Sequence, residues 1–142
     1  MILKQEHLKE LHLIDMNKLD IINTLKKYNL DKNEYIVISG AAMVLYGIKE
    51  ETSDIDIAVS QNYYSYLLNN YDCIFKKINE YGNKVYIIDS IIDFSTTYYN
   101  KEKVYVNAIP LQSLKDILKL KLNLNREKDK IDIEKIKEYL NE

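Results

Sequence analysis

Two aspartates separated by one apolar residue, Asp54 and Asp56, are the side chains of this sequence best placed to do chemistry. They open a run at residues 54–59 that alternates polar and apolar positions and then becomes wholly apolar, which is typical of a strand. Side chains two residues apart on a strand project from one face, so the two carboxylates are expected side by side. Like charges about 4 Å apart repel by about 4 kcal/mol at an effective dielectric constant of about 20. A divalent cation would offset this repulsion; the alternative is a solvent-facing strand with ordinary surface acids.

A third carboxylate, Asp93, stands among the apolar residues Ile91, Ile92 and Phe94. A lone carboxylate in an apolar strand is costly unless it is paired or bound to a metal. Asp89 competes for the same role, but its position between two expected strands is better explained as that of a turn residue. We therefore expect Asp54, Asp56 and Asp93 to be ligands of Mg²⁺ or Mn²⁺.

Ser39 and Gly40 follow a short β-branched run at residues 35–38 and precede an apolar segment. Glycine lets the backbone approach a ligand closely, and the amides at the start of a helix attract phosphate. The hydroxyl of Ser39 adds a donor. The alternative is an ordinary helix start, because small residues cap helices in many proteins.

The elements that must position these residues can be read from periodicity and from turn residues. Helices are expected at residues 4–28, 41–46, 61–70 and 111–140, the second ending at Gly47 and the last divided near residues 127–132. Strands are expected at residues 35–38, 54–59, 84–88, 91–97 and 104–109, the last ended by Pro110. This order predicts an α/β or α+β domain, a mixed sheet flanked by helices. One domain is expected, with an N-terminal helical segment (1–33), a sheet core (34–109) and C-terminal helices (110–142).

The composition is that of a folded globular domain and not of a membrane-spanning or strongly basic protein. A chain of 142 residues, 46% hydrophobic and 30% charged, can bury a core without staples. A net charge of −2 gives no general basic field for nucleic acid, although a local basic patch is compatible with it. The single cysteine, Cys73, and the absence of a signal-peptide pattern indicate a reducing cytoplasm. The apolar runs are too short for a membrane span, so no membrane association is expected.

Taken together, these residues resemble the signature of the nucleotidyltransferase superfamily, which has the DNA polymerase β-like fold. That signature combines a glycine-rich turn opening a helix, an acidic pair on the next strand and a third acid on a later strand. The resemblance is strongest to small bacterial enzymes of the abortive-infection toxin and minimal-nucleotidyltransferase kind, where G-G-x-A…Y-G…R-x-T-x-D-I-D-L is typical. The matching residues here are Ser39-Gly40-Ala41-Ala42, Tyr46-Gly47 and Thr52-Ser53-Asp54-Ile55-Asp56-Ile57.

The C-terminal part extends the resemblance, which covers about residues 35–140. Residues that are similar to the family's closing helices are Leu120-Lys121, Arg126, Lys128-Asp129 and Asp132-Ile133. One departure is a pair of acids, Glu50 and Glu51, where the family usually has an arginine. Acids beside a triphosphate would weaken its binding, so Glu50→Arg is expected to tighten nucleotide affinity.

The resemblance implies a role for each residue of the metal site. Asp54 and Asp56 would bind one or two Mg²⁺ ions and through them the triphosphate. Asp93 would complete the metal site and serve as general base toward an acceptor hydroxyl.

The resemblance also implies phosphate ligands. Ser39 and Gly40 would hold the terminal phosphates. Lys121 would point from the C-terminal helix toward a phosphate, with Lys128 two turns further along the same face. The alternative for both lysines is a solvated helix surface.

The implied activity is transfer of a nucleoside monophosphate from a nucleoside triphosphate, such as ATP, to a protein, RNA or small-molecule acceptor. A second possibility is a non-catalytic nucleotidyltransferase-like binding module, for instance the antitoxin half of a toxin–antitoxin pair. A third is a plain α/β interaction domain with surface acids. The carboxylate triad favours the first, and the acids at residues 50–51 favour the second.

Overall fold

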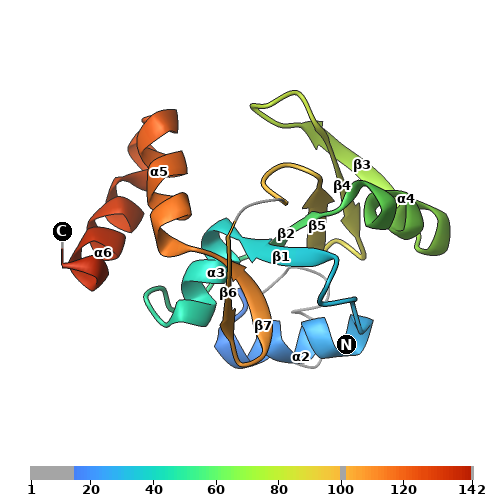
Figure 1. The fold of residues 1–142 in the computed structure, drawn as a ribbon, viewed down its shortest axis with the longest axis horizontal. Helices are drawn as coiled ribbons and strands as arrows, with labels where there is room; N and C mark the ends of the chain where they lie inside the picture. The colour runs from blue at the N-terminus through green and yellow to red at the C-terminus, as the bar shows by residue number, and fades with distance from the viewer. Residues whose placement is uncertain (1–14, 100–101, 142) are drawn as a thin grey trace, which may run out of the picture.

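The computed structural model describes residues 15–99 and 102–141, which form a mixed α/β fold with a seven-stranded sheet and five α-helices (Figure 1). The α/β class expected from the sequence is therefore confirmed. In chain order the elements are α2 (Lys18–Tyr28), β1 (Tyr35–Ile38), α3 (Ser39–Tyr46), β2 (Ile55–Val59), α4 (Gln61–Asn70), β3 (Cys73–Ile78), β4 (Lys84–Ile88), β5 (Ile92–Ser95), β6 (Lys103–Val106), β7 (Ile109–Gln112), α5 (Leu114–Leu124), the short 3₁₀ helix η1 (Glu127–Asp129) and α6 (Lys130–Leu140).

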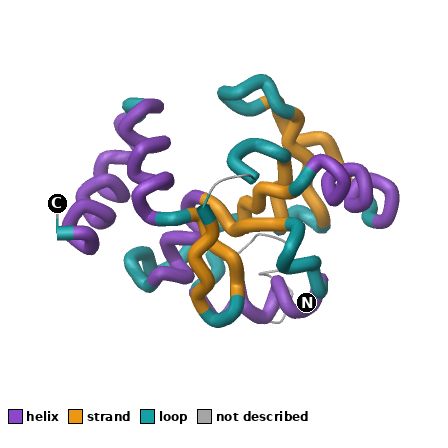
Figure 2. The backbone as a smooth tube through the Cα atoms, viewed as in Figure 1, coloured by secondary structure: helices purple, strands orange, loops and turns teal. Residues whose placement is uncertain are grey.

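The sheet has the strand order β3-β4-β5-β2-β1-β7-β6. Figure 2 shows the strands in orange between helices in purple. Strand β2 runs parallel to β5, and β1 runs parallel to β7, while the other neighbouring pairs are antiparallel. Figure 1 shows α5 and α6 together at one end of the molecule, and α4 with the β3–β4 hairpin at the other. Strand β2, which carries Asp56 and directly follows Asp54, is thus the middle strand of the seven.

Along β2 and β5, apolar side chains on one face of the sheet alternate with acidic side chains on the other. Ile55, Ile57 and Phe94 belong to the main hydrophobic cluster, which also takes in side chains of α2, α3 and α4. Because successive strand residues point to opposite faces, Asp56 and Asp93 project from the other side of the sheet. Helices α2, α3 and α4 therefore pack with the apolar side chains of β2 and β5, and the acids project to the opposite side.

Helix α3 begins directly at the end of β1, two residues earlier than the sequence predicted. Ser39 has a positive φ of 57°, which makes the turn from strand to helix abrupt. The predicted stop is confirmed: Gly47 has φ 85°, and its amide donates to carbonyls of the last helical turn.

Two strands were not predicted, and one boundary was wrong. Strand β3 lies at the edge of the sheet with mostly exposed side chains, so it lacks the alternation that marks a half-buried strand. The predicted strand at residues 104–109 is two strands, β6 and β7, joined by a turn at Asn107 and Ala108, both with positive φ as in a type I′ turn. Pro110 lies inside β7, opposite Tyr105, and does not end a strand.

Within the described residues, the helices near the two ends of the chain have other bounds than expected. Helix α2 starts at Lys18, where Asn17 and Asp20 form a capping box. Met16, which was expected in this helix, forms an isolated antiparallel β-bridge with Thr52. The rest of the predicted helix at residues 4–28 lies outside the described residues. The predicted C-terminal helix is divided at Asn125, which has φ 48°, and its first two residues belong to β7.

Candidate metal centre

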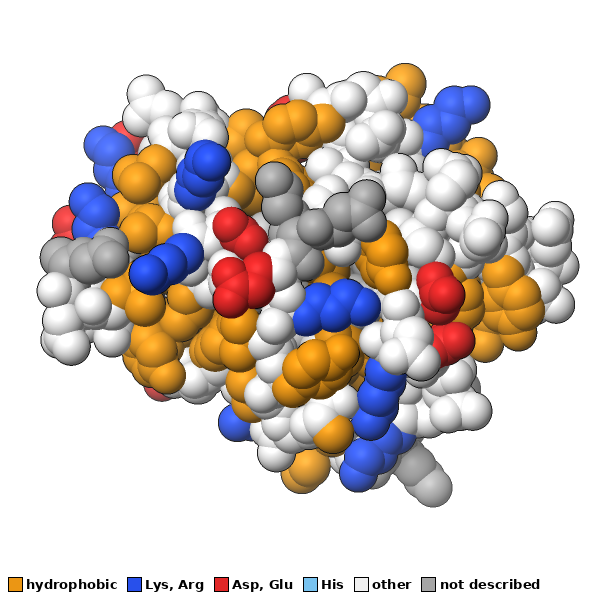
Figure 3. All heavy atoms as spheres, in the orientation of Figure 1, with side chains coloured by type: hydrophobic (Ala, Val, Ile, Leu, Met, Phe, Trp, Pro, Cys, Tyr) orange, Lys and Arg blue, Asp and Glu red, His pale blue; other side chains and the backbone are white. Residues whose placement is uncertain are grey.

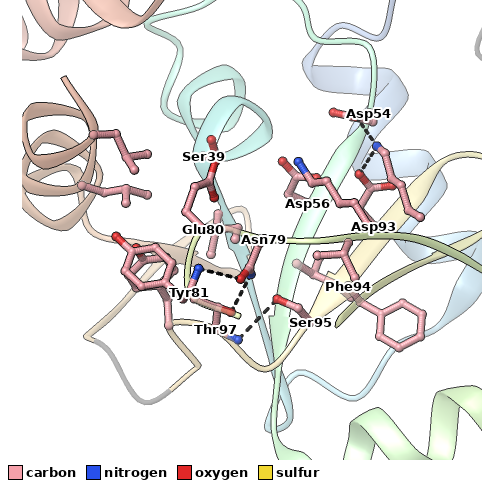
Figure 4. Close-up of a pocket in the computed structure, with 18 of the residues that line it drawn as sticks. Ser39, Asp54, Asp56, Asn79, Glu80, Tyr81, Asp93, Phe94, Ser95 and Thr97 are labelled. Atoms are coloured by element: carbon pink, nitrogen blue, oxygen red, sulfur yellow. Dashed lines mark hydrogen bonds and ion pairs between the residues drawn. The ribbon is translucent and has the colours of Figure 1, made fainter. Parts of the chain in front are cut away.

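The structure brings together the three aspartates that the sequence singled out. One carboxylate oxygen from each of Asp54, Asp56 and Asp93 lies within 4.8 Å of the others (Figure 4). Strand register explains the cluster: Asp56 is aligned with Asp93 across the parallel strands β2 and β5, and Asp54 precedes Asp56 by two residues. Two carboxylates from paired strand positions and a third from the residue just before β2 form a donor set suited to a hard divalent cation.

Burial and the neighbouring acids raise the pKa of two of these carboxyls, Asp56 and Asp93. Burial, followed by the charges of Asp54 and Asp93, raises the pKa of Asp56 well above its usual value. Burial also raises the pKa of Asp93, which is 4% exposed, although a hydrogen bond from Lys76 opposes the shift. Oδ1 of Asp93 is buried and has no hydrogen-bond partner among the described residues. An unsatisfied buried carboxylate oxygen in an acidic cluster is a fitting position for a metal ligand.

A cation that the sequence analysis missed, Lys76, lies against the triad. Its Nζ is 2.5 Å from Oδ2 of Asp93 and 3.4 Å from Oδ2 of Asp54. Burial would lower the pKa of Lys76, but the hydrogen bond and charge of Asp93 outweigh that effect and raise it. The only signal in the sequence was a pair of lysines in the run Cys73–Ile78, which was not recognised as a strand.

A β-bulge in β3 turns Lys76 toward the aspartates. Phe75 is aligned with Tyr86 and Lys77 with Val85, so Lys76 is an extra residue without a partner on β4. Phe75 stacks edge-on against Tyr86, with ring centroids 5.7 Å apart. The bulge places Lys76 and Lys77, although consecutive, along the same cleft.

This cleft lies between the acidic face of the sheet and the C-terminal end of α5. Its cavity volume is about 240 Å³, slightly below the range usual for small-molecule sites, and it is open to solvent. Figure 4 shows the triad at one end and Tyr81 and Thr97 at the other. Asn79 donates to Thr97 (2.8 Å), which ties the loop after β3 to the segment after β5. The basic residues that line the cleft are Lys76, Lys77, Arg126 and Lys128.

Of the two residues Ser39 and Gly40, only Ser39 lines this cleft. Ile38 is aligned with Asp56, so Ser39 follows beside the triad and lines the cleft. Its amide donates to Oε1 of the buried Gln112 (3.1 Å). Gly40 does not line the cleft; a Cβ there would lie 3.2 Å from Oγ1 of Thr52. The structure thus gives Gly40 a close-packing role against the segment that leads into β2.

The structure places Lys121 and Lys128 differently from each other. Lys121 points inward but is 4% exposed, does not line the cleft, and bonds Asp129 (2.9 Å) and Asp132 (3.5 Å). Lys128 lines the cleft from η1. The prediction that both lie on one helix face was wrong, because α5 ends at Leu124.

The acids Glu50 and Glu51 are exposed and do not line the cleft. The neighbouring Lys49 bonds Asp132 (3.5 Å), so this loop faces α6. Among the described residues, the cation nearest the carboxylates is Lys76, from a different element than the sequence pattern suggested.

The molecular surface carries no dominant charge on the face in Figure 3, where basic and acidic side chains are interspersed with apolar ones. Within the described residues, no helix has both the length and the apolar character that crossing a bilayer requires. Comparison of the chain with protein-family models, curated proteins and solved structures gave no match. The geometry of the cleft is therefore the main support for a function.

Proposed function

We propose that the chain is a metal-dependent nucleotidyltransferase, which moves a nucleoside monophosphate from a nucleoside triphosphate to an acceptor. The observation that carries the proposal is one cleft in which three clustered carboxylates face four basic side chains. Carboxylates suit a divalent cation, and lysine and arginine suit phosphate oxygens. The proposal includes the nucleotidyltransferase fold, supported by an acidic pair on β2 beside a third acid on β5.

The residues present fit a divalent cation. Asp54, Asp56 and Asp93 supply oxygen donors, and the unpartnered Oδ1 of Asp93 is a buried acceptor that a cation would satisfy. When bound, Mg²⁺ or Mn²⁺ would neutralise phosphate charge and polarise the reacting phosphorus centre.

The basic residues would bind and orient the polyphosphate. Lys77 and Lys128 line the cleft and form no ion pair within residues 15–99 and 102–141. Arg126 also lines it, but its guanidinium is shared with Asp129 (2.6 Å) and Glu80 (3.3 Å). Lys77 and Lys128 are therefore the cations most available to a triphosphate.

The proposed reaction is an in-line substitution at the α-phosphorus. The acceptor oxygen forms a bond to that phosphorus, the bond to the bridging oxygen of the β-phosphate breaks, and pyrophosphate leaves with the electron pair. Where the acceptor is a hydroxyl, Asp93 takes its proton, a role consistent with the raised pKa of this carboxyl. Protein, RNA and small molecules all remain acceptors that this chemistry allows.

A second candidate function is a non-catalytic binding module, such as the antitoxin half of a toxin–antitoxin pair. One observation favours it: Lys76 already neutralises part of the triad without any metal. In that case the cleft would bind an anionic or protein partner without transferring a nucleotide.

Labelled nucleotides distinguish the two functions. The protein is incubated with α-³²P-labelled ATP, GTP, CTP and UTP, Mn²⁺ and cell lysate, and the acceptor is sought by electrophoresis and chromatography. The enzyme function predicts a labelled acceptor that disappears with the double variant Asp54→Asn, Asp56→Asn and persists with the exposed control Asp72→Asn. Absence of label with every nucleotide would favour the binding module.

A further inference from the structure

We propose that Lys76 is an internal counter-ion, which holds the cation position of the triad in the metal-free protein and leaves it when a divalent cation binds. Its ammonium then becomes a ligand for the phosphates in the same cleft. The inference rests on the proposed function for the identity of the cation and the anion. It adds a coupling between the two ligands, through a residue that the sequence pattern did not indicate.

Lys76 contacts two of the three carboxylates that would hold a metal. Its Nζ contacts Oδ2 of Asp93 at 2.5 Å and Oδ2 of Asp54 at 3.4 Å. Mg²⁺ binds carboxylate oxygens at about 2.0–2.1 Å, so an ion sharing these oxygens would touch the ammonium. Two cations in contact repel strongly, and only one of them can occupy the position.

The side chain of Lys76 can move away from the triad. Its side chain is 36% exposed, whereas that of Asp93 is 6% exposed, so the lysine is the solvent-accessible partner of the pair. It extends from a bulge on the edge strand β3 and has no partner on β4 to fix its backbone position. A lysine has a flexible four-carbon stem, and its charge can relocate without a change in the fold.

The place to which Lys76 can move is already basic. Lys77 is next to it along the cleft, and Lys128 lines the wall formed by the C-terminal helices. An anion held between these side chains lies within the cleft that Lys76 also lines. The released ammonium would therefore add to the anion affinity only after the metal has bound, which is a positive coupling between the two ligands.

Calorimetric titration with Mn²⁺ alone tests the first half of this inference. Removing the ammonium with Lys76→Met should tighten Mn²⁺ binding by at least about tenfold, or ~1.4 kcal/mol. Lys77→Met removes the same charge from the next residue, and Lys76→Arg keeps the charge. We expect neither control to bind Mn²⁺ more than about threefold more tightly than the unaltered protein does. If Lys76→Met does not fold, which circular dichroism will reveal, Lys76→Gln takes its place.

A titration of ATP at saturating Mn²⁺ tests the second half. Lys76→Met should weaken ATP binding by about tenfold while it tightens Mn²⁺ binding. A merely structural lysine would not change the two affinities in opposite directions. Unchanged or tighter ATP binding would overturn the role of Lys76 as a phosphate ligand.

The outcomes also separate this inference from the proposed function. If the unaltered protein binds Mn²⁺ and Lys76→Met binds it equally or more weakly, the counter-ion role is wrong and the metal site stands. If only Lys76→Met binds Mn²⁺, the lysine holds the position permanently; displacement is overturned, and the non-catalytic function is favoured. If no variant binds Mn²⁺, the metal site and the inference both fail.

Discussion

Asp93 lies directly opposite Asp56 in the register of the parallel strands β5 and β2, on the face of the sheet that the core helices do not cover. The backbone hydrogen bonding of β2 and β5 fixes the two Cα positions, so the two side chains start from neighbouring points on the sheet. The neighbouring Asp54 adds a third acid to them. The arrangement costs stability unless a cation compensates it, and the first prediction follows from that cost.

Replacing one of these acids should stabilise the metal-free protein. The pKa of Asp56 is higher in the folded protein than in the unfolded chain, so its contribution to stability is greatest at low pH and is lost as pH rises through the folded pKa. Asp56→Asn cannot ionise and escapes this loss. In chelator at pH 7.5 we expect it to unfold at higher urea, with a gain of about 1 kcal/mol. A gain that does not shrink toward pH 4 would contradict the explanation.

Removal of the third acid should affect transfer more than binding. Asp93→Asn should lower nucleotide transfer by at least about a hundredfold, because the variant loses both a ligand and the proposed general base. Nucleotide binding should survive better, since Asp54 and Asp56 remain. Steady-state kinetics and calorimetry on the same preparation measure both quantities. Full activity would eliminate Asp93, and Asp89 would become the next candidate.

The acids at residues 50–51 should matter less than the sequence pattern suggested. Glu50 is exposed and does not line the cleft, and water and salt weaken the effect of an exposed charge. We now expect Glu50→Arg to change ATP affinity by less than about threefold at physiological salt. Lys128→Met, inside the cleft, should weaken it by about tenfold. The reverse order would mean that the triphosphate lies beside the loop at residue 50.

Lys121 should act on stability and not on the ligand. Its ammonium is buried against Asp129, whose pKa is lowered because hydrogen bonds from Arg126 and Lys121 outweigh the effect of burial. Lys121→Met leaves a buried acid short of a partner and should cost about 3 kcal/mol or more. The ATP affinity of the folded variant should stay within about threefold of the original. A larger loss of affinity at unchanged stability would restore Lys121 as a phosphate ligand.

The ion pair of Lys121 and Asp129 should make the stability of the protein depend on pH. Because the folded pKa of Asp129 is lowered, its contribution is present above the unfolded value of about 3.9 and is lost as pH falls through the folded pKa. The free energy of unfolding of Asp129→Asn should therefore fall less steeply as the pH is lowered from 5 to 2, as followed by circular dichroism. An equally steep fall would show that the pair contributes little.

Local patterns predicted the strand of Asp54 and Asp56 and the turn at Asp89, because each depends on alternation or on a single residue's backbone preference. The pairing of Asp56 with Asp93 depends on strand order, which no local pattern encodes. Lys76 was missed for the same reason: its position depends on a bulge that exists only once β3 pairs with β4. The prediction that Pro110 ends a strand was wrong because Pro110 lies in β7, a strand between β1 and β6 that periodicity alone did not reveal.

The central claim is that Asp54, Asp56 and Asp93 form a metal centre, and thermal unfolding with Mn²⁺ tests it most directly. A ligand that binds only the folded state stabilises it by about 2.7 kcal/mol at a hundred times its dissociation constant. We predict that Mn²⁺ raises the melting temperature of the unaltered protein and of Asp72→Asn, and that the double variant Asp54→Asn, Asp56→Asn shows no rise. An equal rise in the double variant, or none in the unaltered protein, would contradict the claim.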